Sequence, residues 1–113
     1  MVAASARLLI AVLSVAILGS MGGSIAVAAE TDVPKVVVKD FMFTPMSLTV
    51  KAGSTVTWVN MDDEPHTVVS NTQLFRSGAL DTKETFSFKF TEPGTYHFTC
   101  SIHPRMVGTI VVQ

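Results

Sequence analysis

The sequence has almost no cysteine: Cys100 is the only one among 113 residues. A single cysteine excludes an internal disulfide, although small exported domains commonly compensate for a limited core with paired cysteines. The side chain could be a small buried hydrophobic group or could pair with another chain. A metal ligand becomes the stronger interpretation only when the neighbouring residues are taken into account.

Charge is also scarce. Charged residues make up 15% of the chain, and the formal net charge is −1 at pH 7. Non-specific nucleic-acid binding requires many cations that neutralise phosphates. We therefore expect no nucleic-acid partner.

The amino-terminal segment has one charged residue, Arg7, followed by an apolar run over residues 8–18. The small residues at 26–29 are typical of a cleavage site, and cleavage after Ala28 or Ala29 fits equally well. This pattern predicts an export signal, which places the protein in the periplasm or outside the cell. An uncleaved signal would instead anchor it in the membrane, but the apolar core is short for a span of about 20 residues.

The domain organisation follows from this interpretation. Residues 1–29 are the predicted signal peptide, and residues 30–113 suffice for one small domain. We expect no stable membrane span after cleavage.

The predicted domain consists of short strands separated by polar turns. Phe86, Phe88 and Phe90 alternate with polar residues, as expected for a sheet with one buried face. Because no convincing amphipathic helix is present, the pattern predicts an all-β, antiparallel sandwich. The expected strands are 35–39, 47–50, 55–59, 67–70, 85–90, 95–100 and 109–112.

Three potential metal ligands follow one another at intervals of three residues: Cys100, His103 and Met106. A tight loop that leaves a strand could turn all three toward one point. Sulfur and imidazole ligands without a carboxylate favour copper or zinc, and the methionine favours copper, because two His and one Cys with a weak axial Met are typical of blue copper. The second histidine is expected to be His66, which follows a polar loop, whereas His97 lies on the strand face opposite Cys100.

The sequence resembles the cupredoxins, small blue-copper electron carriers, and most closely the amicyanin and pseudoazurin group. The spacing Cys-x-x-His-x-x-Met, with proline after the histidine, is similar to the short ligand loop of amicyanin. The resemblance spans nearly all of the predicted domain. It rests on Phe43-x-Pro45, on Leu48-Thr-Val-Lys-Ala-Gly-Ser-Thr-Val-Thr-Trp58-Val-Asn60, on Pro65-His66-Thr-Val68, and on Pro93-Gly94-Thr-Tyr96-x-Phe98-x-Cys100-x-x-His103-Pro104-x-Met106-x-Gly108.

The resemblance implies a Greek-key fold and one type 1 copper ion, which cycles between Cu(I) and Cu(II). It implies equatorial ligation by His66, Cys100 and His103, with Met106 as a distant axial ligand. The expected function is one-electron transfer between redox protein partners, by a monomer that is not an enzyme. The alternative is a periplasmic copper carrier or storage protein with no role in electron transfer.

Two details modify this expectation. The residue after the first ligand is commonly asparagine in the family, where it ties two ligand loops together, and here it is Thr67, whose hydroxyl makes fewer hydrogen bonds. The acidic residues Asp62, Asp63 and Glu64 precede His66. We interpret them as a solvated loop in preference to a site that steers a cationic partner.

Overall fold

The computed structural model describes residues 33–113, so the predicted signal segment lies outside the described residues. This part of the chain forms strands and contains no helix that could cross a membrane. The strands are β1 (Lys35–Lys39), β2 (Met42–Thr44), β3 (Ser47–Val50), β4 (Ser54–Asn60), β5 (Val69–Ser70), β6 (Thr85–Phe90), β7 (Gly94–Thr99) and β8 (Val107–Val112).

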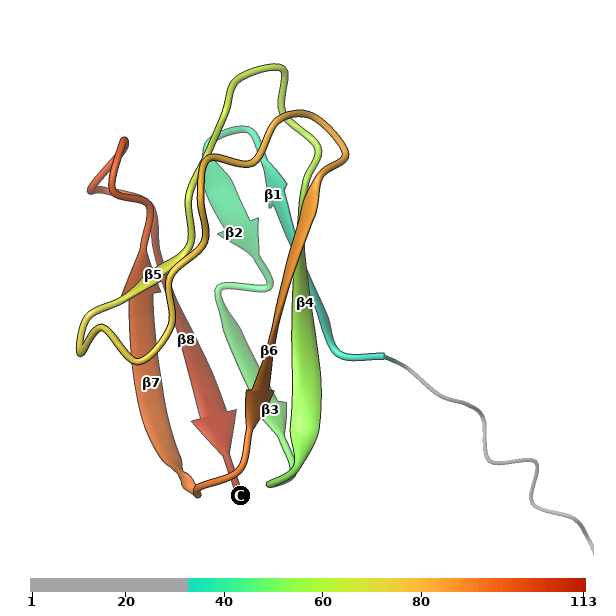
Figure 1. Ribbon diagram of the computed structural model, residues 1–113, viewed down its shortest axis with the longest axis vertical. Helices are drawn as coiled ribbons and strands as arrows, with labels where there is room; N and C mark the ends of the chain where they lie inside the picture. The colour runs from blue at the N-terminus through green and yellow to red at the C-terminus, as the bar shows by residue number, and fades with distance from the viewer. Residues whose placement is uncertain (1–32) are drawn as a thin grey trace, which may run out of the picture.

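Two four-stranded sheets face each other (Figure 1), one in the order β2-β1-β4-β6 and the other in the order β3-β8-β7-β5. The predicted all-β sandwich is therefore confirmed. Its strands are not all antiparallel, however, because β1 pairs with β4 and β3 pairs with β8 in parallel. The chain leaves the first sheet after β2, adds β3 to the second sheet and returns as β4, which consequently runs in the same direction as β1.

Three elements differ from the prediction. Strand β2 was not expected, because the turn before it contains Asp40-Phe41 and lacks the glycine that usually marks a two-residue hairpin. The expected strand 67–70 is reduced to β5, and β7 ends one residue before Cys100. The predicted metal ligands therefore lie in irregular segments next to the strands.

The core between the sheets is largely aromatic. Trp58 is fully buried and contacts Phe75, Phe86, Phe90 and Phe98 with ring centroids 5.4–6.3 Å apart. A Cβ atom added at Gly108 would lie 2.3 Å from Cζ of Phe98, so only glycine fits opposite that ring. Burial of these rings supplies the main stabilising free energy of the domain.

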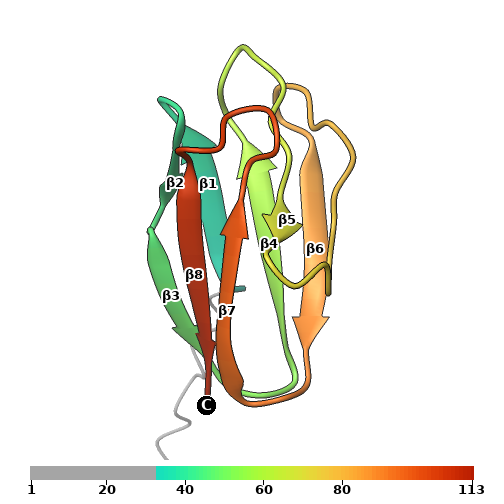
Figure 2. The ribbon, with the colours of Figure 1, turned by 90° about the vertical axis from the view of Figure 1, so that its left-hand side faces the viewer.

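Three connections meet at one end of the sandwich: the β1–β2 hairpin, the loop that follows β4, and the β7–β8 loop (Figure 2). Although these connections come from distant parts of the chain, they lie at the same end of the sandwich, so side chains from all three can surround one point. This end contains the predicted ligands.

Candidate metal centre

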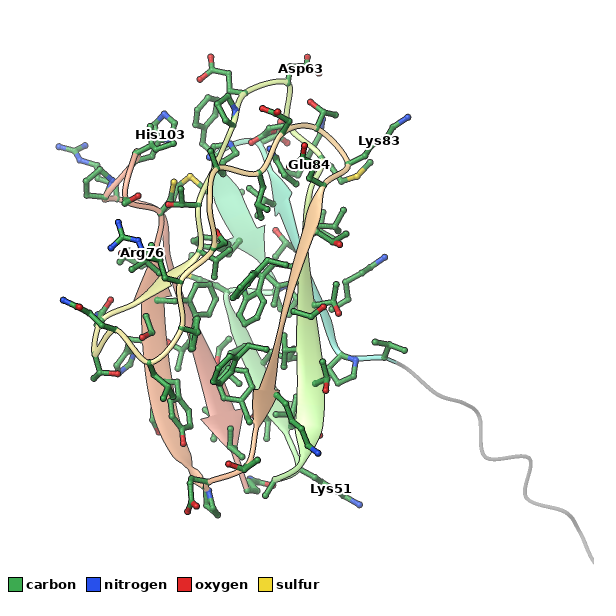
Figure 3. The ribbon with its side chains drawn as sticks, viewed as in Figure 1. Lys51, Asp63, Arg76, Lys83, Glu84 and His103 are labelled. Carbon is green, nitrogen blue, oxygen red and sulfur yellow. The ribbon has the colours of Figure 1, made fainter. Side chains whose placement is uncertain are left out.

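His66, Cys100 and His103 come together, with their ligand atoms all within 4.8 Å of one another. The Cys100 sulfur lies 3.8 Å from Nδ1 of His66 and 3.9 Å from Nδ1 of His103. Cys100 and His66 are fully buried, whereas His103 is half-buried in the exposed β7–β8 loop, where Figure 3 shows it at the end of the sandwich.

These distances match the requirements of a single three-coordinate ion. Metal–sulfur and metal–nitrogen bonds of about 2.3 and 2.0 Å place the two donor atoms about 3.5 Å apart at a tetrahedral angle and about 3.7 Å apart at a trigonal one. The observed separations of 3.8 and 3.9 Å are within a few tenths of an ångström of these values, so one ion could bind the sulfur and both nitrogens. A donor set of two His and one Cys is the chemistry of a blue-copper site.

The β7–β8 loop is held tightly by its own backbone. The N–H of His103 donates to the carbonyl of Cys100, the N–H of Met106 donates to the carbonyl of His103, and the N–H of Cys100 donates to the carbonyl of Met106. Met106 is only 4% exposed. With His66 from the other loop, these residues form an arrangement like that of a type 1 copper site.

Asp62 fixes the orientation of His66. Its Oδ2 lies 2.8 Å from Nε2 of His66, and both side chains are buried. Because the carboxylate accepts the Nε2 proton, Nδ1 is left to face the cysteine sulfur as the ligand atom. Interpreting all three acidic residues as a solvated loop was therefore wrong for Asp62, whereas Asp63 and Glu64 are exposed. Figure 3 shows Asp63 at the tip of the loop after β4.

The same carboxylate binds the tip of the β1–β2 hairpin. Oδ1 accepts the backbone N–H of Asp40 at 2.7 Å, and Oδ2 accepts that of Phe41 at 3.0 Å. Burial alone raises the pKa of Asp62, but the hydrogen bonds from Phe41, Asp40 and His66 outweigh it and lower the pKa below its ordinary value of 3.8. Asp62 is therefore a carboxylate that accepts three N–H donors.

The hairpin tip has an unfavourable backbone conformation. Asp40 and Phe41 have φ angles of 53° and 57°, in the left-handed region that costs a residue with a side chain about 1–2 kcal/mol. The Phe41 ring packs edge-on against both imidazoles, with centroids 5.2 Å from His66 and 5.0 Å from His103. The strained turn thus places an aromatic ring against both histidine ligands.

The Cys100 sulfur is prepared to be a thiolate. Burial raises the pKa of the thiol, but hydrogen bonds from the backbone N–H of Thr67 and from His66 and His103 lower the pKa from 9.0 to about 6. The Thr67 N–H lies 3.4 Å from the sulfur. The thiolate is the form that binds metal. Because the pKa is lowered, less free energy is needed to deprotonate the thiol at neutral pH when a metal binds.

Thr67 also ties the two ligand loops together, the role that the family gives to asparagine. Its hydroxyl accepts the backbone N–H of Ser101 at 2.8 Å and lies 2.8 Å from the Ser101 hydroxyl. Oγ1 of Thr67 is also 3.7 Å from the cysteine sulfur. The shorter side chain therefore makes the inter-loop tie with the help of Ser101, a contact that sequence reasoning missed.

His97 lies as the sequence predicts, and Asn60 supports the ligand loop from the end of β4. His97 is exposed on the other face of β7 and pairs through Nδ1 with the Thr109 hydroxyl at 3.0 Å, away from the ligand cluster. Asn60 is fully buried, accepts the N–H of Asp62 and donates to the carbonyls of Glu64 and Leu80. It closes the loop that contains Asp62 and His66.

Sequence reasoning missed Asp62 and Phe41 as parts of the site. A signal for Asp62 existed in its position four residues before His66 in a loop, although exposed acidic residues are common at such positions. No local signal marked Phe41, because its contacts depend on how the hairpin folds over the ligand loops.

Comparison with known proteins agrees with this geometry. The model of the cupredoxin-like domain matches residues 8–112. Amicyanin-alpha from Methylorubrum extorquens is 36% identical over 98 residues, which cover 78% of this chain and 76% of that protein. Plastocyanin from Scenedesmus fuscus is 41% identical over 85 residues, 64% of this chain and 87% of that protein.

A solved structure gives the same result in three dimensions. The purple cupredoxin from Nitrosopumilus maritimus is 32% identical, has a TM-score of 0.67, and is matched over 71% of this chain and 99% of its own. The chain therefore belongs to the cupredoxin-like family. Its amicyanin and plastocyanin relatives are electron carriers, in agreement with the expectation that the protein is not an enzyme.

Proposed function

We propose that the protein binds one copper ion through His66, Cys100, His103 and Met106 and carries single electrons between redox proteins. The observation that carries the proposal is the close approach of the Cys100 sulfur to the two Nδ1 atoms, at 3.8 and 3.9 Å. Copper would supply the Cu(I)/Cu(II) couple. The protein would hold its ligands in place and limit the access of water.

Preorganisation favours electron transfer over copper delivery. Cys100 and His66 are fully buried: Cys100 accepts the N–H of Thr67 from the other ligand loop, and His66 is held by Asp62 of its own loop. A ligand set held by such contacts would rearrange little when the charge on the ion changes, and it would release its ion slowly to another protein. A delivery protein would be better served by exposed, mobile ligands.

The half-buried ligand His103 is the proposed point of electron entry and exit. It borders a hollow of about 430 Å³ on the surface. Phe41 and Ile102 in its lining are about half exposed, so a partner could approach the ring closely over an apolar surface. His66 is fully buried and offers no such route.

Voltammetry distinguishes an electron carrier from a copper carrier. We expect the copper-loaded protein to show a reversible one-electron wave in the physiological range and to exchange electrons with redox proteins while retaining its copper. Tight Cu(I) binding with no reversible wave, and transfer of the ion to a competing Cu(I) chelator, would support the delivery or storage function instead. Copper uptake should also raise the unfolding temperature, because the ion binds the folded state.

Export to the periplasm and a monomeric state complete the proposal. The apolar segment 8–18 and the small residues at 26–29 support cleavage after Ala28 or Ala29. The intact mass of the protein recovered from the periplasm is expected to correspond to a chain that begins at Ala29 or Glu30, and light scattering should give the mass of one chain. A full-length protein in the membrane fraction would contradict cleavage.

A further inference from the structure

The tip of the β1–β2 hairpin contains a phenylalanine where the backbone favours glycine. Two-residue hairpins with positive φ at both central positions usually have glycine at the second one. Phe41 occupies that position with a φ of 57°, and its side chain is 45% exposed. Neither the turn nor the hydrophobic core explains why a large ring is kept there at the cost of backbone strain.

The position of the ring suggests an explanation. The Phe41 side chain is partly exposed to solvent. Its ring also contacts both imidazoles, at interplanar angles of 85° for His66 and 84° for His103. The two histidine rings are themselves 5.1 Å apart. Phe41 therefore contacts both imidazole rings, and the three rings form one cluster at the edge of the site.

Asp62 connects this cover to the ligand. Its two oxygens accept the N–H groups of Asp40 and Phe41 and the Nε2 proton of His66. One buried carboxylate thus holds the strained turn in place and orients the imidazole beneath it. All three partners are donors, so an amide at this position would place its own N–H₂ group against at least one of them.

We propose that Phe41 is a lid over the metal centre and that Asp62 is the positioning residue that keeps the lid closed. The lid limits the access of small external ligands and thiol reagents to the Cys100–imidazole cluster. The inference rests on the proposed function for its biological meaning, because a metal-free cluster would not need such protection. Its physical content can nevertheless be tested without metal.

The test uses four variants. Phe41→Gly removes the ring and at the same time relieves the positive φ, so the fold should be at least as stable as that of the wild type. Asp62→Asn breaks the hold on the turn. The matched controls are Met42→Ala, which truncates the exposed neighbour of Phe41, and Asp63→Asn, which makes the same chemical change at the exposed neighbour of Asp62.

The first readout is the rate at which iodoacetamide alkylates Cys100 in the metal-free protein at pH 8. We expect acceleration of at least about tenfold for Phe41→Gly and Asp62→Asn, and less than about twofold for the two controls, because reaction of a buried thiol requires local opening. The unfolding temperature of each variant shows whether global unfolding contributes. A wild-type rate in a folded Phe41→Gly variant would overturn the lid, and acceleration by Phe41→Gly but not by Asp62→Asn would overturn the role of Asp62.

The second readout is the absorption of the copper-loaded variants on addition of azide. Azide should change the spectrum of Phe41→Gly and of Asp62→Asn and leave those of the wild type and the controls unchanged. Faster alkylation in a protein that takes up no copper would preserve the lid and reject the proposed function. If Phe41→Gly and Asp62→Asn give coloured copper proteins with wild-type alkylation rates and no azide response, the proposed function stands and the lid is rejected.

Discussion

Replacement of Cys100 by serine is expected to remove the colour of the oxidised protein completely. The wild-type copper protein should be intensely blue or green, because charge transfer from the buried thiolate to Cu(II) absorbs visible light. The Cys100 sulfur is the one soft anionic donor among the proposed ligands, and a serine hydroxyl is a hard donor that offers no comparable transition. Visible absorption spectroscopy after stoichiometric addition of Cu(II) checks this result.

The same substitution should weaken copper binding at least about 100-fold, since even residues that only support a metal ligand commonly contribute 10–100-fold in affinity. The matched control is His97→Ala, which removes a histidine three residues away that pairs with Thr109 on the other face of β7. This control should retain full colour and affinity. A coloured Cys100→Ser protein, or a colourless His97→Ala protein, would contradict the proposed ligand set.

The metal-free protein is expected to become more stable as the pH is raised from 6 to 9. The pKa of Cys100 is lowered from 9.0 to about 6 in the folded state, so the unfolded chain binds more protons between these values. Stability from a lowered acid pKa is fully present above the unfolded-state pKa and is lost as the pH falls through the folded-state pKa. The free energy of unfolding should increase by up to about 1.4 kcal/mol per pH unit, and by at most about 4 kcal/mol over the interval.

Urea unfolding of the metal-free, reduced protein at several pH values measures this effect. The Cys100→Ser variant is the control, because serine does not titrate, and the difference in unfolding free energy between the two proteins should grow with pH and level off near pH 9. The lowered pKa of Asp62 acts below this window, where stability is lost as the carboxylate becomes protonated. Parallel pH profiles for wild type and variant would show that the folded state does not stabilise the thiolate.

Much of the fold was predictable because a strand with one buried face shows an alternation of apolar and polar residues in its own sequence. The alternation of Phe86, Phe88 and Phe90 with polar residues predicted β6, and the expected strand 55–59 lies within β4. Strand β2 was not predictable in the same way. Its hairpin contains phenylalanine at a position where glycine would have marked the turn, so the local signal was absent.

The parallel direction of two strand pairs was also beyond the local pattern. A strand has the same alternation of buried and exposed residues whether its neighbour runs parallel or antiparallel. The order in which the chain visits the two sheets decides the direction, and that order depends on long-range packing.

The sequence by itself determined the chemistry of the proposed centre, because the spacing of Cys100, His103 and Met106 and the periodicity of β7 depend only on neighbouring residues. Only the tertiary structure decided how the ligands are held. Asp62 contacts Phe41 across 21 residues, and Thr67 contacts Ser101 across 34. Such contacts leave no periodic signal in the sequence, since they arise only when separate loops meet at one end of the sandwich. For that reason the burial of Asp62 could not be predicted from the sequence.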